Sequence, residues 1–226
     1  MAKRLAKDLK EMGNKIIKYL DSLDANRDYN DITDIINSEW SSILWWLKED
    51  IIALFKLGPR YVAKAVDSKL DLVKINILAI KYVEGLKYLQ NINIPDSIPH
   101  TTYHKVKEII GNGILDGSSY TDIASTMRKQ LDAWAFSKAR AELIAINTVG
   151  HAYETGRYEA ITQVVNSGET VVKYWDTVGD NKVTPECRHN EAVSPIWFNE
   201  NWPSGDNKAP RDTNPRCRCT TNYGIK

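Results

Sequence analysis

The residues of this sequence that could bind a metal ion or perform chemistry gather near its C-terminus. They are three cysteines and one histidine, Cys187, His189, Cys217 and Cys219, and the 226-residue chain has no other cysteine. A tetrahedral zinc site uses such a mixture of thiolates and imidazole. One hypothesis is therefore a structural zinc site made by these four side chains, with no other cofactor.

The spacing of these residues is unusual for zinc. One residue separates Cys187 from His189, and one separates Cys217 from Cys219, whereas zinc ligands usually have at least two residues between them. On a strand, residues i and i+2 lie about 6.5 to 7 Å apart on one face, so the chain would have to bend toward one ion. Two alternatives stay open: buried free thiols, or one disulfide between Cys187 and the tail pair. Three cysteines cannot all pair within one chain, which argues against a secreted disulfide framework.

The same cysteines and histidine give little support for a catalytic site. A cysteine nucleophile needs a base that reaches its proton, and a single intervening residue rarely aims Cys187 and His189 at one proton. Asp176 and Asp180 could join them in a metal-dependent nuclease or toxin-like site, which is one alternative function, but carboxylates in a turn more often bind its backbone. The sequence has no Walker loop, dinucleotide fingerprint or Gly-x-Ser-x-Gly motif. We therefore predict no catalytic residues and no enzyme activity.

The charge of the chain is nearly balanced, with 30 basic and 29 acidic residues, so the whole molecule does not have the charge of a protein that coats DNA. The tail from residue 207 onward is different, because it has five basic residues and one acidic residue. Arg216 and Arg218 are candidates to contact DNA phosphates, which makes a DNA-binding accessory factor a second alternative function. In the other interpretation, these arginines fix the tail through salt bridges or carbonyl groups.

Apolar runs in the sequence are short. The longest, such as residues 75–80 and 51–54, fall far below the ~20 residues that a membrane helix requires. The basic start of the chain is not followed by the apolar core of an export signal. We therefore expect that the protein does not associate with a membrane. We also expect that it is made in a cytoplasm.

Much of the N-terminal part of the chain has the sequence pattern of helices. Apolar residues recur at three- and four-residue steps over about residues 3–22, 32–54 and 60–90, which predicts three amphipathic helices. Gly58-Pro59 predicts the boundary between the last two, because glycine suits a helix end and proline suits a first turn. Prolines at 95 and 99 then predict the end of a helical N-terminal region, residues 1–95.

The sequence of the middle of the chain predicts three further helices. The second of them begins with a capping motif. A short helix over residues 101–110 should end at Gly111-Asn112-Gly113, and Ser119-x-x-Asp122 resembles a capping box. A long helix is expected over residues 136–165. It contains Gly150 and Gly156, which indicate either a close helix crossing or a kink, since each lowers helix propensity by about 1 kcal/mol relative to alanine.

The tail predicts a small β-rich module. Val171 to Trp175 has the β-branched and aromatic composition of a strand, Gly179-Asp180-Asn181 suits a turn, and Val183-Thr184 could return as the second strand of a hairpin. We therefore expect an α+β fold: a predominantly helical N-terminal region and long helix, with a small C-terminal β-hairpin module rich in turns. The second domain would cover residues 100–226, with helices over 101–166 and the cysteine-containing tail over 169–226.

Several short motifs in this order resemble the Mu F-like head morphogenesis family of tailed bacteriophages, the minor capsid proteins. They are a tryptophan-bearing strand, a turn of the form Asp-Asn-Lys-Val, a Pro-x-Cys and a closing Pro-Arg-Cys-Arg-Cys, and the residues that form this signature are Trp175, Asp180, Cys187, Pro215, Cys217 and Cys219. The resemblance extends upstream to residues 117–124 and 139–145, and it covers about residues 105–223. It is the order of several weak motifs that carries it.

The resemblance implies a minor capsid protein that takes part in head morphogenesis, associates with the portal and acts in DNA ejection. The implied partners are the portal protein, other capsid components and packaged double-stranded DNA. The implied location is inside the capsid of the virion, and the host cytoplasm during assembly. Family members often show Cys-x-x-Cys and a final His-Pro-x-Cys-Arg-Cys, whereas Asn190 and Asn214 stand at two of those ligand-like positions here.

Overall fold

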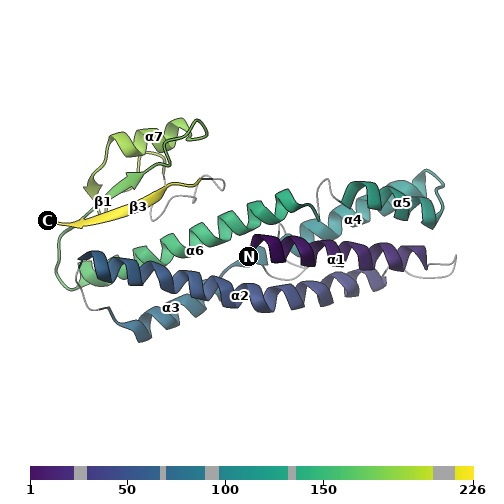
Figure 1. Ribbon diagram of the computed structural model, residues 1–226, viewed down its shortest axis with the longest axis horizontal. Coiled ribbons are helices and arrows are strands. Elements are labelled where there is room, and N and C mark those ends of the chain that lie inside the picture. The colour runs from purple at the N-terminus through teal and green to yellow at the C-terminus, as the bar shows by residue number, and fades with distance from the viewer. Residues whose placement is uncertain (23–29, 67–69, 90–96, 132–135, 206–216) are drawn as a thin grey trace. The chain divides into compact units, whose positions relative to one another are not determined.

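A computed structural model of the chain describes residues 1–22, 30–66, 70–89, 97–131, 136–205 and 217–226 (Figure 1). These residues form helices and one small antiparallel sheet, so the predicted α+β class is confirmed. The elements are α1 (Ala2–Asp21), α2 (Asn30–Val66), α3 (Leu72–Glu84), the 3₁₀ turn η1 (Lys87–Leu89), α4 (Ile98–Leu115), α5 (Tyr120–Leu131), α6 (Lys138–Asn166), β1 (Val171–Asp176), α7 (Pro185–Ala192), β2 (Ile196–Trp197) and β3 (Thr220–Ile225).

The chain divides into two compact units. The first contains Met1–Lys48 and Glu84–Ala145, and the second contains Glu49–Val83 and Ile146–Lys226. The long helices α2 and α6 therefore contribute residues to both units. The division into a helical region 1–95 and a domain 100–226 stays a prediction.

Helix α1 buries the apolar face that its sequence predicts. The buried apolar residues recur at helical spacing: Leu5, Leu9, Met12, Ile16, Ile17 and Leu20. Within the same unit, Trp40 Nε1 donates a hydrogen bond to the Leu89 carbonyl (3.0 Å), and Trp46 Nε1 donates to the Asp8 carboxylate (2.9 Å). These bonds satisfy two indole N–H groups that would be costly to bury without a partner.

Helix α5 begins with the predicted capping box. The Ser119 hydroxyl accepts a hydrogen bond from the Asp122 backbone N–H (3.2 Å), and the Asp122 carboxylate accepts one from the Ser119 backbone N–H (3.3 Å). The predicted helix end at residues 111–113 is wrong, because α4 continues to Leu115. Gly113 serves the packing of α4 on α5, since a Cβ there would lie 2.4 Å from Ile123 Cγ1, and the left-handed glycine after the helix is Gly117 (φ 68°).

The predicted helix boundary at Gly58-Pro59 is wrong, because α2 passes through both residues and ends at Val66. The predicted third helix is accordingly shorter and later, as α3 over Leu72–Glu84. A Cβ at Gly58 would lie 2.5 Å from the Tyr153 carbonyl oxygen. Gly58 therefore permits a close approach of α6 and does not cap a helix.

Gly156 makes the matching approach from α6. A Cβ at Gly156 would lie 2.1 Å from the Phe55 carbonyl oxygen and 3.1 Å from Pro59 Cδ. Pro59 has no N–H to donate to the carbonyl four residues earlier, and that carbonyl belongs to Phe55. The proline thus frees the carbonyl against which Gly156 packs, and the expected close helix crossing is confirmed at this glycine.

The sheet has the order β2-β1-β3, and both pairs are antiparallel (Figure 1). The predicted strand at 171–175 is confirmed as β1, but the predicted return strand at Val183-Thr184 is wrong. Thr184 instead caps α7, where its hydroxyl accepts a hydrogen bond from the Cys187 N–H, and Pro185 fills the first turn. The partners of β1 are the two-residue β2 and the terminal β3.

The core of the second unit lies where β1 and α6 meet. Its buried members are Val62, Ala160, Ile161, Val164, Val171 and Phe198. Phe198, just after β2, stacks on Tyr158 of α6 with ring centroids 4.9 Å apart. The apolar segment around Phe198 therefore anchors the tail on the long helix.

Candidate functional site

The three cysteines of the chain converge in the second unit. Their Sγ atoms all lie within 4.8 Å of one another, and those of Cys187 and Cys217 are 3.6 Å apart. Cys187 lies in the first turn of α7, and the other two lie just before β3. All three side chains are buried. Segments 30 residues apart in sequence thus bring their thiols to one point.

Local structure explains how Cys217 and Cys219 face the same point with one residue between them. They precede β3, so the spacing of a regular strand does not apply to them. The backbone N–H of Cys219 donates to the Sγ of Cys217 (3.4 Å), a local contact that a regular strand does not make. The two sulfurs therefore converge despite the single residue between them.

Aromatic residues surround the thiols. The rings of Trp175 and Trp202 meet edge to face with centroids 5.2 Å apart, and both pack with the three cysteines and Val183 in one buried cluster. Trp175 lies on β1, and Trp202 follows β2. The cluster therefore ties the sheet, α7 and the chain before β3 together.

The thiols differ in their affinity for protons. Burial raises the pKa of Cys187, and hydrogen bonding with Cys219 together with burial raises the pKa of Cys217. The pKa of Cys219 is lowered, chiefly because the Cys217 thiol stabilises its thiolate by a hydrogen bond, while burial opposes this shift. Cys219 is thus the residue of the three that ionises most readily.

The fourth predicted ligand, His189, is exposed on α7 and is not part of this group. Among the described residues, the cysteines form the only cluster of three or more potential metal ligands. Asp176 accepts a hydrogen bond from Asn222, and Asp180 forms an ion pair with Arg218. The structure therefore does not bring together the residues of the alternative nuclease site.

The arginines proposed to contact DNA have different positions. Arg218 donates two hydrogen bonds to the Asp180 carboxylate, at 2.8 and 2.6 Å, and this pairing holds the pKa of Asp180 below its ordinary value. It links the turn after β1 to the chain before β3, as the tail-fixing interpretation of Arg218 expects. Arg216 and Pro215 lie outside the described residues.

A buried ion pair was missed by the sequence analysis. The side chains of Glu154 and Arg157 on α6 are 2% and 3% exposed, and their charged groups lie 3.3 Å apart. Arg157 also donates to the hydroxyl of Thr220 (2.6 Å) and to the side-chain oxygen of Asn222 (2.7 Å). The other Glu154 oxygen accepts from the backbone N–H of Thr221 (3.1 Å). The pair thus binds β3 to the long helix.

Aromatic rings complete the environment of this ion pair. The Arg157 guanidinium lies over the rings of Tyr61, Tyr153 and Tyr223, at 5.0, 5.5 and 5.6 Å from their centroids. Burial raises the pKa of Tyr223. A charged pair three residues apart on a helix usually lies on the solvent face. The one available signal was Gly156 between the two charges, since a close crossing buries the residues beside it.

A lysine in the centre of β1 is also buried. The side chain of Lys173 has no exposed surface, and its ammonium group lies 5.2 Å from the centroid of the Trp202 ring. Burial lowers the pKa of Lys173 to about 8, while nearby Glu200 raises it. Residues i and i+2 of a strand share a face, so Lys173 lies on the same face of β1 as Trp175.

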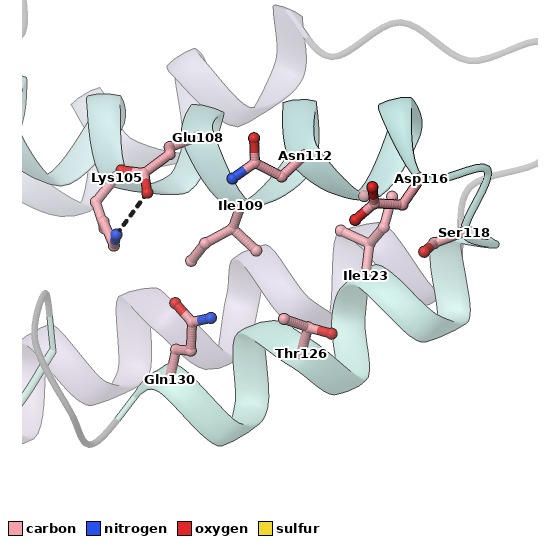
Figure 2. Close-up of a pocket in the computed structure, with 10 residues that line it drawn as sticks. Lys105, Glu108, Ile109, Asn112, Asp116, Ser118, Ile123, Thr126 and Gln130 are labelled. Carbon is pink, nitrogen blue, oxygen red and sulfur yellow. Dashed lines mark hydrogen bonds and ion pairs between the residues drawn. The ribbon is translucent and has the colours of Figure 1, made fainter.

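The first unit has a small pocket between α4 and α5, lined by polar groups (Figure 2). Its volume is about 170 Å³, below the range of about 300 to 1,000 Å³ that is typical of ligand sites. Lys105 on its wall pairs with Glu108 at 2.9 Å, so part of the charge in the pocket is already neutralised. These features do not indicate a substrate site.

These observations define an α+β protein whose C-terminal sheet is held by a thiol cluster and by a buried ion pair. A family model described as phage Mu protein F like protein matches residues 104–222, more than half of the chain, and the chain belongs to this family. The resemblance predicted from the motifs is thereby confirmed. No curated protein and no solved structure matches the chain.

Membership indicates a bacteriophage head protein, of the kind that acts in head morphogenesis as a minor capsid component. It also indicates capsid-related partners, association with the virion and a structural role. None of the described helices has both the length and the apolar character needed to cross a bilayer.

Proposed function

We propose that this protein is a minor capsid protein of a tailed bacteriophage, that it binds the portal protein and other capsid components during head morphogenesis, and that it lies inside the capsid and acts in DNA ejection. The family match over residues 104–222 is the observation that carries this proposal. The match includes α6, β1, β2, the first half of β3, the thiol cluster and the buried ion pair.

The side chains of the tail support a structural role. Three charged side chains that contact the tail or belong to it form hydrogen bonds within the chain. They are Arg157 and Glu154 of α6 and Arg218 of the tail. Large apolar residues that are exposed on α3, namely Leu72, Val73, Ile77 and Ile80, are available to a protein partner. Charged groups bound within the chain, together with exposed apolar residues on α3, suit assembly with other capsid proteins.

Co-expression with the portal protein of the same genome tests this proposal. The tagged chain should retain the portal after nuclease treatment, which removes DNA that could bridge the two proteins, and after washing at moderate salt. A tagged unrelated protein of similar size and charge serves as the control. Failure of the portal to co-purify would remove the support for portal association.

An assay with plasmid DNA separates this function from the nuclease alternative. The purified protein should leave supercoiled plasmid intact when Mg²⁺, Mn²⁺ or Zn²⁺ is added. Nicking that persists through purification and disappears in Asp180→Ala would contradict the structural role. Binding of DNA by Arg216 and Arg218 stays a separate prediction, and it requires an affinity that falls steeply with salt and falls further when both are replaced.

A further inference from the structure

We propose that Cys187, Cys217 and Cys219 bind one Zn²⁺ ion through three thiolates, without His189, and that this ion closes the C-terminal module. The proposal is independent of the capsid function, because it concerns how the tail is held and not what the tail contacts. It differs from the ligand set that the sequence predicts, which includes the imidazole.

The distances between the sulfurs suit a shared metal ion. Thiolates bound to zinc lie about 2.3 Å from the metal, which places two sulfurs of a tetrahedral site about 3.8 Å apart. The Sγ atoms of Cys187 and Cys217 are 3.6 Å apart, and all three sulfurs lie within 4.8 Å of one another. A disulfide requires about 2.05 Å. The cluster therefore has nearly the size of a three-thiolate site, and it is larger than a disulfide.

The backbone around the sulfurs holds them in fixed positions. Cys187 lies in the first turn of α7, where its backbone N–H donates to the Thr184 hydroxyl (3.4 Å) that caps the helix. The Cys219 N–H donates to the Cys217 Sγ, a contact that orients a sulfur ligand and compensates part of its charge. These contacts come from two separate segments of the chain, and each fixes a cysteine of the same cluster.

A buried lysine, Lys173, lies next to one ring of the same cluster. Three thiolates and one Zn²⁺ have a net charge of −1, which is costly to bury without a counter-charge. The Lys173 ammonium lies over Trp202, whose ring packs with the three cysteines, and Lys173 is on the same face of β1 as Trp175. A positive group thus lies beside the tryptophan that packs on the three cysteines.

Two described residues near the cysteines, His189 and Asn190, are not part of the sulfur cluster, and Asn214 lies outside the described residues. His189 is exposed, and the buried Asn190 is engaged by Ser204, to which its amide nitrogen donates (2.7 Å) and from whose N–H its oxygen accepts (3.2 Å). The described residues supply no fourth ligand, so in this proposal a water molecule completes the tetrahedral ion. This assignment predicts that cysteine variants lose zinc binding and that a variant at His189 keeps it.

The experiment is metal analysis of the full-length protein, expressed with zinc in the medium and purified without chelator under reducing conditions. We expect one zinc per chain, and Co²⁺ in its place should give the visible and near-ultraviolet absorption of tetrahedral thiolate coordination. Cys187→Ser and Cys219→Ser should each lower zinc affinity by more than about 100-fold. Removing zinc from the wild-type protein should lower its melting temperature.

Two control variants separate loss of a ligand from loss of packing. Val183→Ala removes apolar volume from the same buried cluster and should retain one zinc per chain, and His189→Ala should do the same. Wild-type protein without stoichiometric zinc, or with a disulfide after purification under reducing conditions, would overturn the proposal. Loss of zinc in His189→Ala would overturn the three-thiolate assignment and restore the imidazole as a ligand.

Discussion

Replacement of Gly156 by alanine should destabilise the second unit, although alanine is the better helix former. A Cβ at this position would lie 2.1 Å from the Phe55 carbonyl oxygen, which is backbone and cannot rotate away. An ordinary contact between carbon and oxygen is about 3.3 Å, so α2 and α6 would have to separate by about 1 Å. Overpacking of this kind costs about 1 to 3 kcal/mol.

The helix propensity of alanine opposes this cost, by about 1 kcal/mol. Because the clash is with backbone, we take the upper part of the overpacking range and expect a net loss of about 2 kcal/mol in the free energy of unfolding. Urea denaturation followed by circular dichroism and by tryptophan fluorescence measures this loss. The separation of the helices should also weaken the Glu154–Arg157 pair beside the glycine.

Gly111→Ala is the matched control, because it is the same substitution within a helix. A Cβ at Gly111 of α4 would have no neighbour within 4 Å. This variant should therefore be more stable than wild type, by up to about 1 kcal/mol. If Gly156→Ala is as stable as wild type, or if the two substitutions change stability in the same direction, the close crossing of α2 and α6 is refuted.

Three further predictions concern the polar groups. Arg157→Met should cost about 3 to 5 kcal/mol by urea denaturation because it leaves Glu154 buried and unpaired, and combining it with Glu154→Leu should recover most of the loss; no loss in the single variant would contradict a buried pair. Ser119→Ala should cost about 1 kcal/mol through loss of the α5 cap, and an unchanged denaturation midpoint would exclude that role. The carboxyl of Asp180 should titrate below its ordinary pKa in an NMR pH series, and Arg218→Ala should move the midpoint back up. Since the folded-state pKa is lowered, the stabilisation is present above the ordinary carboxyl pKa and is lost as pH falls through the folded value; equal midpoints in both proteins would contradict the ion pair.

The periodic part of the fold was predictable from the sequence, because it depends on local spacing. The apolar face of α1, the capping box at Ser119 and the strand before Trp175 involve residues close together in the chain. Gly58-Pro59 led to a wrong helix boundary. A glycine followed by a proline is typical of a helix end, but here the same pair allows α6 to approach α2 closely. The neighbour that distinguishes the two, α6, lies about a hundred residues away in sequence.

The site was predictable in its residue types and less so in its geometry. Three cysteines in one segment indicated a shared role, but the strand spacing suggested poor convergence because β3 was not known to start after Cys219. The hairpin prediction failed for a related reason: Thr184-Pro185 is a strong start for α7, and the partner of β1 comes from the end of the chain. The burial of Glu154 and Arg157 could not be predicted from the sequence, because it depends on β3 and on the close crossing at Gly156, which are tertiary contacts.

The central claim, a minor capsid protein inside the phage head, is tested most directly by quantitative mass spectrometry of purified virions of the phage that encodes this chain. Virions should contain the protein in a few copies per particle, protected from added protease until the capsid is opened. Virions made from a genome with a nonsense codon in the gene should lack it and should form fewer intact heads. Absence of the protein from wild-type virions, or its complete removal by external protease, would contradict the claim.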